Sequence, residues 1–180
     1  FLDANPAFGI VFGQFANWYP NSLGQFESPS NFLATPERWE VPEPLSGWIY
    51  TAELLACPIS MITPVIRREV FDETGPFDES LEAGSDYDFW LRATYRYQAH
   101  KLPRCFALYR QHGRGITSRA RPRSTMAVVL ERAIKSSGLS GLHGNAVTRA
   151  QIRRRFAELW FHFAMLHLEI GDPVIGATAL

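Results

Sequence analysis

Cysteine is scarce in this sequence, with Cys57 and Cys105 as its only two copies. Their separation matches none of the spacings by which cysteines bind a metal ion. Both lie among apolar residues, where a buried free thiol is the usual state. The pair therefore predicts free thiols and favours a cytoplasmic location.

Long apolar runs are also lacking. No run reaches the roughly 18 residues that a membrane-spanning helix needs, so we expect no transmembrane segment. The opening residues have neither a Met nor the basic start of a signal peptide, and we expect the parent protein to continue upstream of Phe1. A glycine-rich loop ending in Gly-Lys-Ser/Thr is absent too, which excludes a Walker nucleotide site.

Net charge is zero over the 180 residues, but the two halves differ. Residues 1–90 hold 14 acidic and 3 basic side chains, whereas residues 91–180 hold 4 acidic and 15 basic ones. The basic half could meet phosphates, nucleic acid or an acidic membrane surface, or it could pair with the acidic half. No motif of a nucleic-acid reader accompanies it, so we expect no nucleic-acid partner.

The first part of the chain predicts a strand and then a long loop. Residues 10–19 are rich in β-branched and aromatic side chains, which is typical of a buried strand. Residues 20–47 contain five prolines and show no hydrophobic period, which predicts a long loop. Its Trp39 and the nearby Trp48 could stack on a sugar ring or pin the loop onto the core.

Short elements are expected around the centre of the chain. Residues 45–55 fit a helix capped by Ser46. Residues 59–66 fit an edge strand or a bulged strand, because Pro58 precedes them and Pro64 interrupts them. Residues 67–74 predict one or two helical turns closed by Gly75. Residues 99–102 and 105–109 read as two short strands around Pro103.

The most informative stretch runs from Gly75 to Arg92, a turn followed by a helix. Ser85 and Asp88 have the spacing of a capping box at the helix start. Helical periodicity places Asp86 on the apolar face, whereas Asp88 and Arg92 share the opposite face and suit an ion pair. Asp86 is thus either a carboxylate poised to act as a general base or only an acid that favours the helix start.

A basic loop and two helices end the chain. Residues 111–123 carry two glycines and four arginines, a combination that suits a phosphate group. Residues 124–137 and 148–170 predict helices, the second with a capping box at Thr148 and Gln151 and a wide apolar stripe. This helical hairpin could pack on the first part or mediate self-association. The run Arg153–Arg155 reads as a solvated face.

The histidines give few clear signals. His112 opens the basic loop and is either a ligand of a metal ion or diphosphate or an ordinary surface residue. His162 and His167 are five residues apart and face different ways, so we interpret them, with Glu158, as structural.

Three motifs in order resemble the C-terminal half of a family 2 glycosyltransferase. These are the turn Gly75-Pro76-Phe77-Asp78-Glu79, the helix start from Ser85 to Arg92, and the segment Tyr109-Arg110-Gln111-His112. Family members carry G-x-F-D-E, E-D-x-D-x-W-x-R and Y-R-x-H at similar spacing. The resemblance covers roughly residues 1–118 and leaves residues 119–180 as a helical C-terminal extension.

The resemblance implies the acceptor-side half of a GT-A, Rossmann-like α/β domain, with the nucleotide-binding half and its D-x-D upstream of Phe1. It implies transfer of a sugar from a nucleotide-sugar donor to a saccharide, lipid-linked or protein acceptor. Asp86 would be the general base and the reaction would invert the anomeric carbon. Trp90, Arg110 and Asp88 would serve the substrate, with Trp90 beneath the site. His112 would bind a divalent metal, Mg²⁺ or Mn²⁺.

Two consequences of the resemblance bear on this chain. Because the donor half is missing, we expect the chain alone to be inactive and the parent to act in cell-surface polysaccharide synthesis, at or near the inner face of the membrane. Ser85 stands where the family has Glu, and this departure keeps a second hypothesis open. In that alternative the chain is a non-catalytic carbohydrate-binding or protein-interaction module.

Overall fold

Two long strands, β1 (Phe8–Trp18) and β4 (Gln98–Arg110), run parallel at the centre of the sheet. The computed structural model describes residues 1–34, 44–112, 115 and 119–180. Two short antiparallel strands, β2 (Ser46–Gly47) and β3 (Val65–Ile66), complete a four-stranded sheet in the order β2-β4-β1-β3. The protein is therefore mixed α/β, as the sequence predicts.

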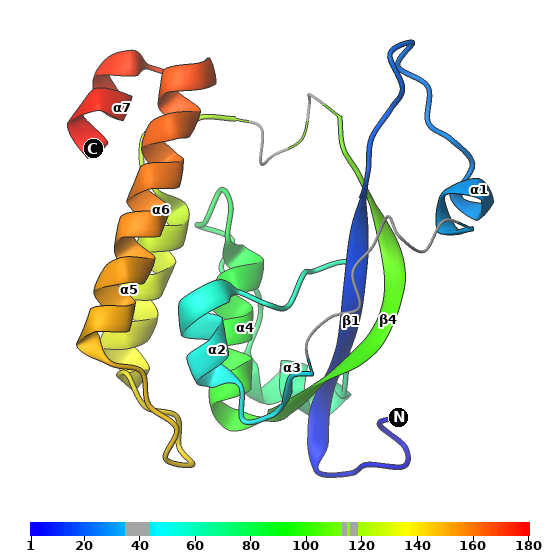
Figure 1. The fold of residues 1–180 in the computed structure, drawn as a ribbon. Helices are drawn as coiled ribbons and strands as arrows, with labels where there is room; N and C mark the ends of the chain where they lie inside the picture. The colour runs from blue at the N-terminus through cyan, green and yellow to red at the C-terminus, as the bar shows by residue number, and fades with distance from the viewer. Residues whose placement is uncertain (35–43, 113–114, 116–118) are drawn as a thin grey trace.

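Helices cover the sheet mainly on one side, and α5 and α6 form an outer layer beyond α2 and α4 (Figure 1). The helices are α1 (Pro29–Leu33), α2 (Tyr50–Ala56), α3 (Arg68–Thr74), α4 (Ser85–Arg96), α5 (Thr125–Ser137), α6 (Arg149–Ile170) and α7 (Pro173–Ala179). Among the described residues, none of these helices combines the length and the apolar character that a membrane crossing requires.

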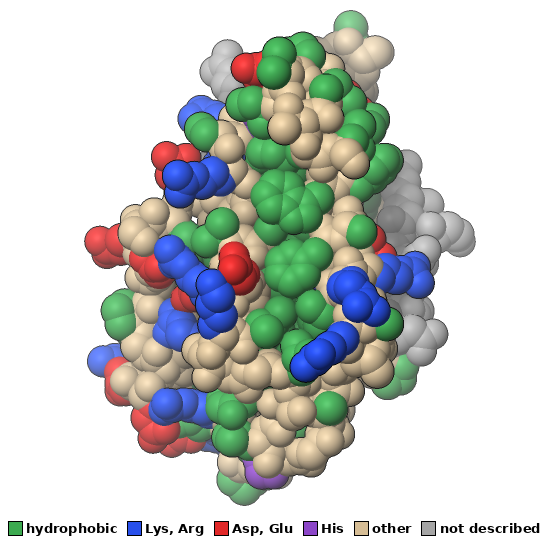
Figure 2. All heavy atoms as spheres, turned by 90° about the vertical axis from the view of Figure 1, so that its left-hand side faces the viewer, with side chains coloured by type: hydrophobic (Ala, Val, Ile, Leu, Met, Phe, Trp, Pro, Cys, Tyr) green, Lys and Arg blue, Asp and Glu red, His purple; other side chains and the backbone are tan. Residues whose placement is uncertain are grey.

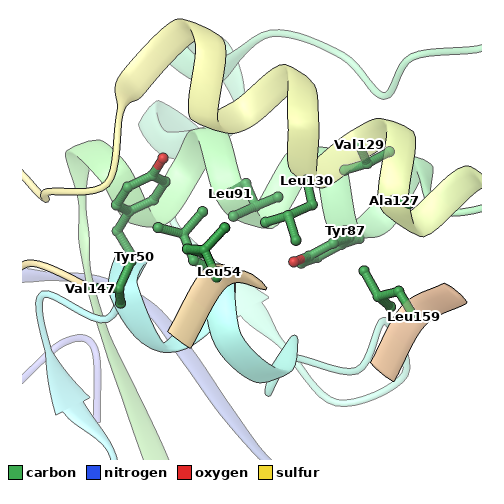
Figure 3. Packing of buried hydrophobic residues seen from close by; sticks show 10 residues of the cluster. Tyr50, Leu54, Tyr87, Leu91, Ala127, Val129, Leu130, Val147 and Leu159 are labelled. Atoms are coloured by element: carbon green, nitrogen blue, oxygen red, sulfur yellow. The ribbon is translucent and has the colours of Figure 1, made fainter. Parts of the chain in front are cut away.

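Two apolar clusters hold these layers together. The first lies between the sheet and α4, where Ile10 and Phe12 of β1 pack with Phe89, Trp90 and Ala93. The second joins α2, α4, α5 and α6 (Figure 3). Its buried members are Tyr50, Leu54, Tyr87, Leu91, Ala127, Val129, Leu130, Val147, Ile152 and Leu159. The C-terminal helices thus share a core with the preceding part of the chain.

The prediction of two short strands around Pro103 is wrong. The chain forms one strand from Gln98 to Arg110 rather than two short strands around Pro103. The register with β1 shifts between Phe12 and Gln14 and again between Gln14 and Phe15, so the ladder absorbs an irregularity near the proline. Strand β2 pairs with β4 at Ala99 and His100. Beyond these residues, β1 is the one neighbour of β4 within the described part of the sheet, so the strand can include a residue without an N–H.

Two helix starts also differ from the prediction. Ser46 lies in β2, where its hydroxyl is 2.8 Å from Nδ1 of His100, and the helix begins at Tyr50 instead. In the predicted loop 20–47, Ser28 caps the short helix α1 with a bond to the Asn31 amide of 3.2 Å. Trp39 lies outside the described residues. Trp48 stacks on the ring of His143 at 3.6 Å.

Other predictions are confirmed. β1 matches the predicted strand to within two residues, β3 lies at the sheet edge, and Gly75 ends α3 with a positive φ of 82°. The reciprocal capping box of α6 is formed, with the Gln151 amide 3.2 Å from the Thr148 hydroxyl. Cys57 and Cys105 are both free, and each is half-buried.

The outer face of α6 exposes apolar side chains. Figure 2 shows a stripe of hydrophobic surface on the face of the molecule that α6 and α5 present, with Lys and Arg on both sides of it. Trp160, Phe161 and Leu168 of α6 are 42%, 59% and 41% exposed. These three residues are called the α6 stripe below.

Candidate functional site

A cavity of about 310 Å³ lies where the start of α4 meets α6 and the segment leading into α5. Asp86 lines it, and we call it the Asp86 cavity. The other lining residues are Cys57, Ala83, Gly84, Arg119, Arg121, Arg123, Ser124, Thr125, Met126, Leu159, His162, Phe163 and Leu166. A larger hollow of about 560 Å³ lies beside it near His167 and α7, but its acid, Asp172, caps α7. The Asp86 cavity is therefore the better candidate for chemistry.

Asp86 stands in the first turn of α4, which the sequence predicts, but the predicted capping box is wrong. Ser85 is the first helical residue and therefore does not occupy the N-cap position. The cap position belongs to Gly84, whose φ of 78° lies in the left-handed region that favours glycine. Asp86 is half-buried and its Oδ1 accepts from the Tyr87 amide at 2.9 Å.

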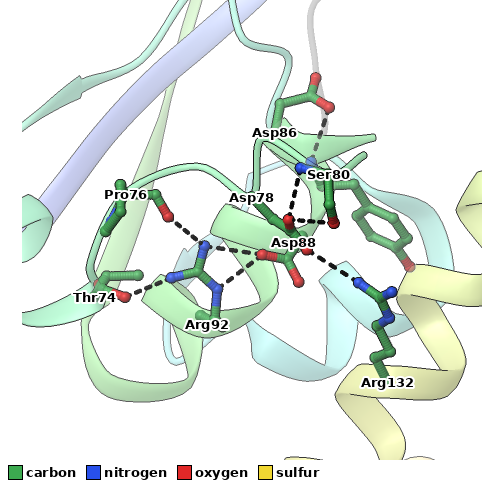
Figure 4. Close-up of polar contacts among 9 residues, drawn as sticks. Thr74, Pro76, Asp78, Ser80, Asp86, Asp88, Arg92 and Arg132 are labelled. Carbon is green, nitrogen blue, oxygen red and sulfur yellow. Dashed lines mark hydrogen bonds and ion pairs between the residues drawn. The ribbon is translucent and has the colours of Figure 1, made fainter. Parts of the chain in front are cut away.

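Asp88 has a different environment from Asp86, also as predicted. Its Oδ2 pairs with Nη2 of Arg92 at 2.8 Å, and the same guanidinium donates to the carbonyl oxygens of Thr74 and Pro76 (Figure 4). Asp88 does not line the Asp86 cavity. Its carboxylate holds Arg92, which ties the turn after α3 to α4, so we assign Asp88 a positioning role.

The neighbouring turn is held by Asp78. Its Oδ1 accepts from the amide and hydroxyl of Ser80 at 2.9 and 2.6 Å, and its Oδ2 accepts from Arg132 of α5 at 3.0 Å (Figure 4). The bonds from Ser80 and the charge of Arg132 hold the pKa of Asp78 below its usual range. The turn and α5 are thereby linked.

Asp86-Tyr87-Asp88 has the spacing of a D-x-D motif, but its two carboxylates do not converge. The Asp86 carboxylate points away from the cluster of Asp78, Asp88 and Arg92 in Figure 4. Among the described residues, no three His, Cys, Asp or Glu side chains come together as a metal-binding group.

Beneath Asp86 lies a buried acid that sequence reasoning missed. Glu53 of α2 is completely buried, and burial raises the pKa of its carboxyl well above the usual value, with the Asp86 charge adding to the effect. The Ile59 backbone opposes this shift, although neither carboxyl oxygen has a well-formed hydrogen bond in the described part of the chain. Burial, Glu53 and Asp86 together raise the pKa of the Cys57 thiol. Burial therefore favours the protonated form of both groups.

Trp90 lies in the core rather than on a substrate surface. It is 2% exposed and packs edge-on against Phe89, with ring centroids 5.0 Å apart. This position is in the layer below α4, between the helix and β1. Trp90 therefore supports the helix that carries Asp86.

Arg110 is the last residue of β4, and His112 follows it two residues later. Neither residue lines the Asp86 cavity. The Arg110 guanidinium stacks 5.1 Å from the ring centroids of both Trp18 and Phe26. His112 is exposed, two residues after the end of β4. The structure thus brings Asp86 together with a different set of bases from the one that the sequence suggested.

That set consists of Arg119, Arg121 and Arg123, called the arginine wall below, with His162 of α6. The arginine wall belongs to the predicted basic loop, and its position in a cavity with Asp86 could not be read from the sequence. His162 is exposed and lines the cavity, so its interpretation as purely structural is not supported by its position. His167 is buried and structural, as expected.

Comparison of the chain with protein-family models, with curated proteins and with solved structures gives no match. The functional argument therefore rests on the motifs and on the geometry of the Asp86 cavity.

Proposed function

We propose that the chain is the acceptor-side half of an inverting, family 2-like glycosyltransferase of GT-A type, in which Asp86 is the general base. The observation that carries the proposal is the position of Asp86, a half-buried carboxylate in the first turn of α4 that lines a cavity of about 310 Å³. The ion pair of Asp88 with Arg92 and the buried Trp90 support it, because both hold the helix that presents Asp86.

The chemistry is a single in-line displacement. Asp86 takes the proton of the acceptor hydroxyl while that oxygen forms a bond to the anomeric carbon of the donor sugar. The bond from the anomeric carbon to the nucleoside diphosphate breaks at the same time, and the electron pair leaves with the diphosphate. Attack from the side opposite the leaving group inverts the configuration of that carbon.

The groups beside Asp86 include the buried Glu53 and the half-buried Cys57. Burial raises the pKa of both the Glu53 carboxyl and the Cys57 thiol, which disfavours additional negative charge next to Asp86. Positive charge comes from the arginine wall, which lines the same cavity as Asp86.

The metal belongs to the same proposal. A Mg²⁺ or Mn²⁺ ion would neutralise charge on the diphosphate of the donor. His112 is exposed and could contribute one imidazole nitrogen, whereas the rest of its ligands would come from the D-x-D of the upstream half. A lone imidazole is a weak site, so we expect no tight metal binding by this chain alone.

The test uses the full-length parent with Mg²⁺ or Mn²⁺ and a panel of UDP-, GDP- and dTDP-sugars, and measures release of the nucleoside diphosphate. Asp86→Asn should lower kcat by roughly 100-fold or more while donor binding persists, because only proton removal is lost. His112→Ala should raise the donor KM.

Asp72→Asn, an equal charge change on the exposed face of α3, is the matched control and should leave turnover unchanged. Unchanged turnover in Asp86→Asn would reject Asp86 as the base. Release with none of the donors would favour the second candidate, a non-catalytic carbohydrate-binding or protein-interaction module, to which Ser85 in place of Glu already points.

A further inference from the structure

The arginine wall gives the Asp86 cavity an excess of positive charge. Three guanidinium groups line it, against the single carboxylate of Asp86. Glu82 pairs with Arg121 of the wall, but the Glu82 side chain is 78% exposed and its Oε2 is 3.9 Å from Nε of Arg121. An exposed pair at that distance offsets little of the charge.

The arginine wall is fixed to the helical layer. The buried His167 of α6 donates from Nε2 to the carbonyl oxygen of Arg121 at 2.7 Å, while its Nδ1 accepts from the Asp172 amide at 3.1 Å. Ala120 lies so close to Gly171 that a Cβ added at Gly171 would come within 2.6 Å of the Ala120 methyl group. The segment that carries the arginines is therefore packed against the end of α6.

Part of the cavity lining is apolar. Leu159, Phe163 and Leu166 of α6 contribute to it together with Met126 of α5. The cavity thus combines cationic side chains, apolar side chains and the Asp86 carboxylate at the start of α4. A neutral saccharide would use hydroxyl hydrogen bonds and would offer no anion to the guanidinium groups of Arg119 and Arg123.

We propose that the acceptor carries an anionic group, a phosphate or a carboxylate, which the arginine wall binds while the reacting hydroxyl faces Asp86. Arginine recognises both anions through paired N–H donors. This inference rests on the proposed function, because it names the substrate class of the same site. In an in-line displacement the leaving diphosphate lies on the far side of the anomeric carbon from the base. Arginines that share a cavity with the base therefore lie on the acceptor side.

The first test is binding to the 180-residue chain without any donor. Titration calorimetry would compare glucose 6-phosphate, glucuronic acid and glucose at one low ionic strength. We expect both anionic sugars to bind at least about tenfold more tightly than glucose, since binding to a guanidinium pair depends on the charge. Equal binding of all three would overturn the proposal.

Two double variants distinguish binding by the arginine wall from a general effect of the protein's positive charge. The double variant Arg119→Gln/Arg123→Gln removes two exposed guanidinium groups of the wall and should weaken the anionic sugars by about tenfold or more. The control Arg153→Gln/Arg154→Gln removes the same charge from exposed positions of α6 outside the cavity and should change binding by less than about twofold. Equal losses in both would overturn the proposal.

Lipid-borne and soluble anions share this chemistry, and a further arm distinguishes them. Sedimentation with phosphatidylcholine vesicles that contain phosphatidic acid would detect a lipid-borne phosphate, whereas glucose 6-phosphate reports the soluble one. Either result supports an anion site when it depends on Arg119 and Arg123, and independence from them in both arms would contradict it.

The full-length parent separates this inference from the proposed function. With an anionic acceptor, Arg119→Gln/Arg123→Gln should raise the acceptor KM about tenfold and leave kcat nearly unchanged. If Asp86→Asn abolishes turnover but neutral and anionic acceptors react equally well, the transferase proposal stands and the anionic acceptor is rejected. If Asp86→Asn leaves turnover unchanged, the proposed function is rejected, whatever the effect of the arginine variants.

Discussion

Glu53 and Asp86 are carboxyl groups close enough to influence each other, yet their surroundings differ completely. Glu53 is sealed between α2 and α4, where the charged form is disfavoured. Asp86 is half-buried at the edge of a cavity that also contains three arginines. Burial therefore raises the pKa of the Glu53 carboxyl, and proteins use such differences in surroundings to give nearby carboxyl groups different roles.

Replacement of Glu53 by Gln gives a pH-dependent prediction. The raised pKa means that the folded protein holds this proton more tightly than the unfolded chain. The resulting stability is present below the unfolded-state pKa of about 4.3 and is lost as pH rises toward the folded-state pKa. Glu53→Gln should therefore gain stability over the native chain between pH 5 and pH 8, by on the order of 1 to 3 kcal/mol.

Urea unfolding of both proteins at pH 5 and pH 8 measures this difference. Glu79→Gln changes an exposed acid in the preceding turn and serves as the control, with the same difference from the native chain at both pH values. Parallel behaviour of Glu53→Gln and the native protein across this range would show that Glu53 is already well solvated.

At the scale of elements, the contact of β1 with β4 depends on a glycine. Phe106 of β4 is 52% exposed and covers Gly13 of β1. A Cβ added at Gly13 would come within 2.5 Å of Cε2 of Phe106 and 3.0 Å of the Arg104 carbonyl oxygen. An aromatic ring that covers a strand glycine is a known way to stabilise a sheet.

Gly13→Ala should therefore destabilise the protein by about 1 to 3 kcal/mol, because the methyl group displaces the Phe106 ring. The double variant Gly13→Ala/Phe106→Ala should lose clearly less than the sum of the single losses, since the ring is no longer there to be displaced. Chemical unfolding of the four proteins in this cycle gives the coupling. Additive losses would mean that the ring moves aside freely.

The elements also show what local sequence could and could not predict. The α6 capping box was predicted because Thr148 and Gln151 contact each other across three residues. The same argument failed at Ser85, because Gly84 adopts a positive φ and takes the cap position. The continuous β4 was missed because Pro103 is tolerated only where the sheet leaves one side of the strand unpaired, a property of the pairing rather than of the segment.

At the scale of the whole molecule, the sequence predicted that Asp86 lies in the first turn of a helix but not which residues share its cavity. Asp86 and Arg121 line the same cavity because α5 and α6 pack on α2 and α4 through the shared apolar cluster. Local periodicity carries no information on such long-range contacts. For the same reason the sequence grouped His112 with Asp86, whereas the structure places His162 in the Asp86 cavity.

Self-association through the C-terminal helices stays a prediction, and the α6 stripe gives it a definite test. Exposed apolar side chains beside one another favour contact with another apolar surface. Trp160→Ser/Phe161→Ser should lower the weight-average sedimentation coefficient at high protein concentration. Leu142→Ser, which removes a 59% exposed side chain away from α6, should not. Identical sedimentation of all three proteins at every concentration would reject the stripe as a contact between copies.

The imidazole of His167 links two parts of the chain that are far apart in sequence. Its two nitrogens bond the Arg121 carbonyl and the Asp172 amide, so the segment before α5 and the start of α7 share one side chain. Local opening at the start of α7 would remove the Asp172 amide from Nδ1 of His167, and the imidazole that donates to the Arg121 carbonyl would be held less firmly. The start of the last helix thus helps to fix the segment that carries the arginine wall.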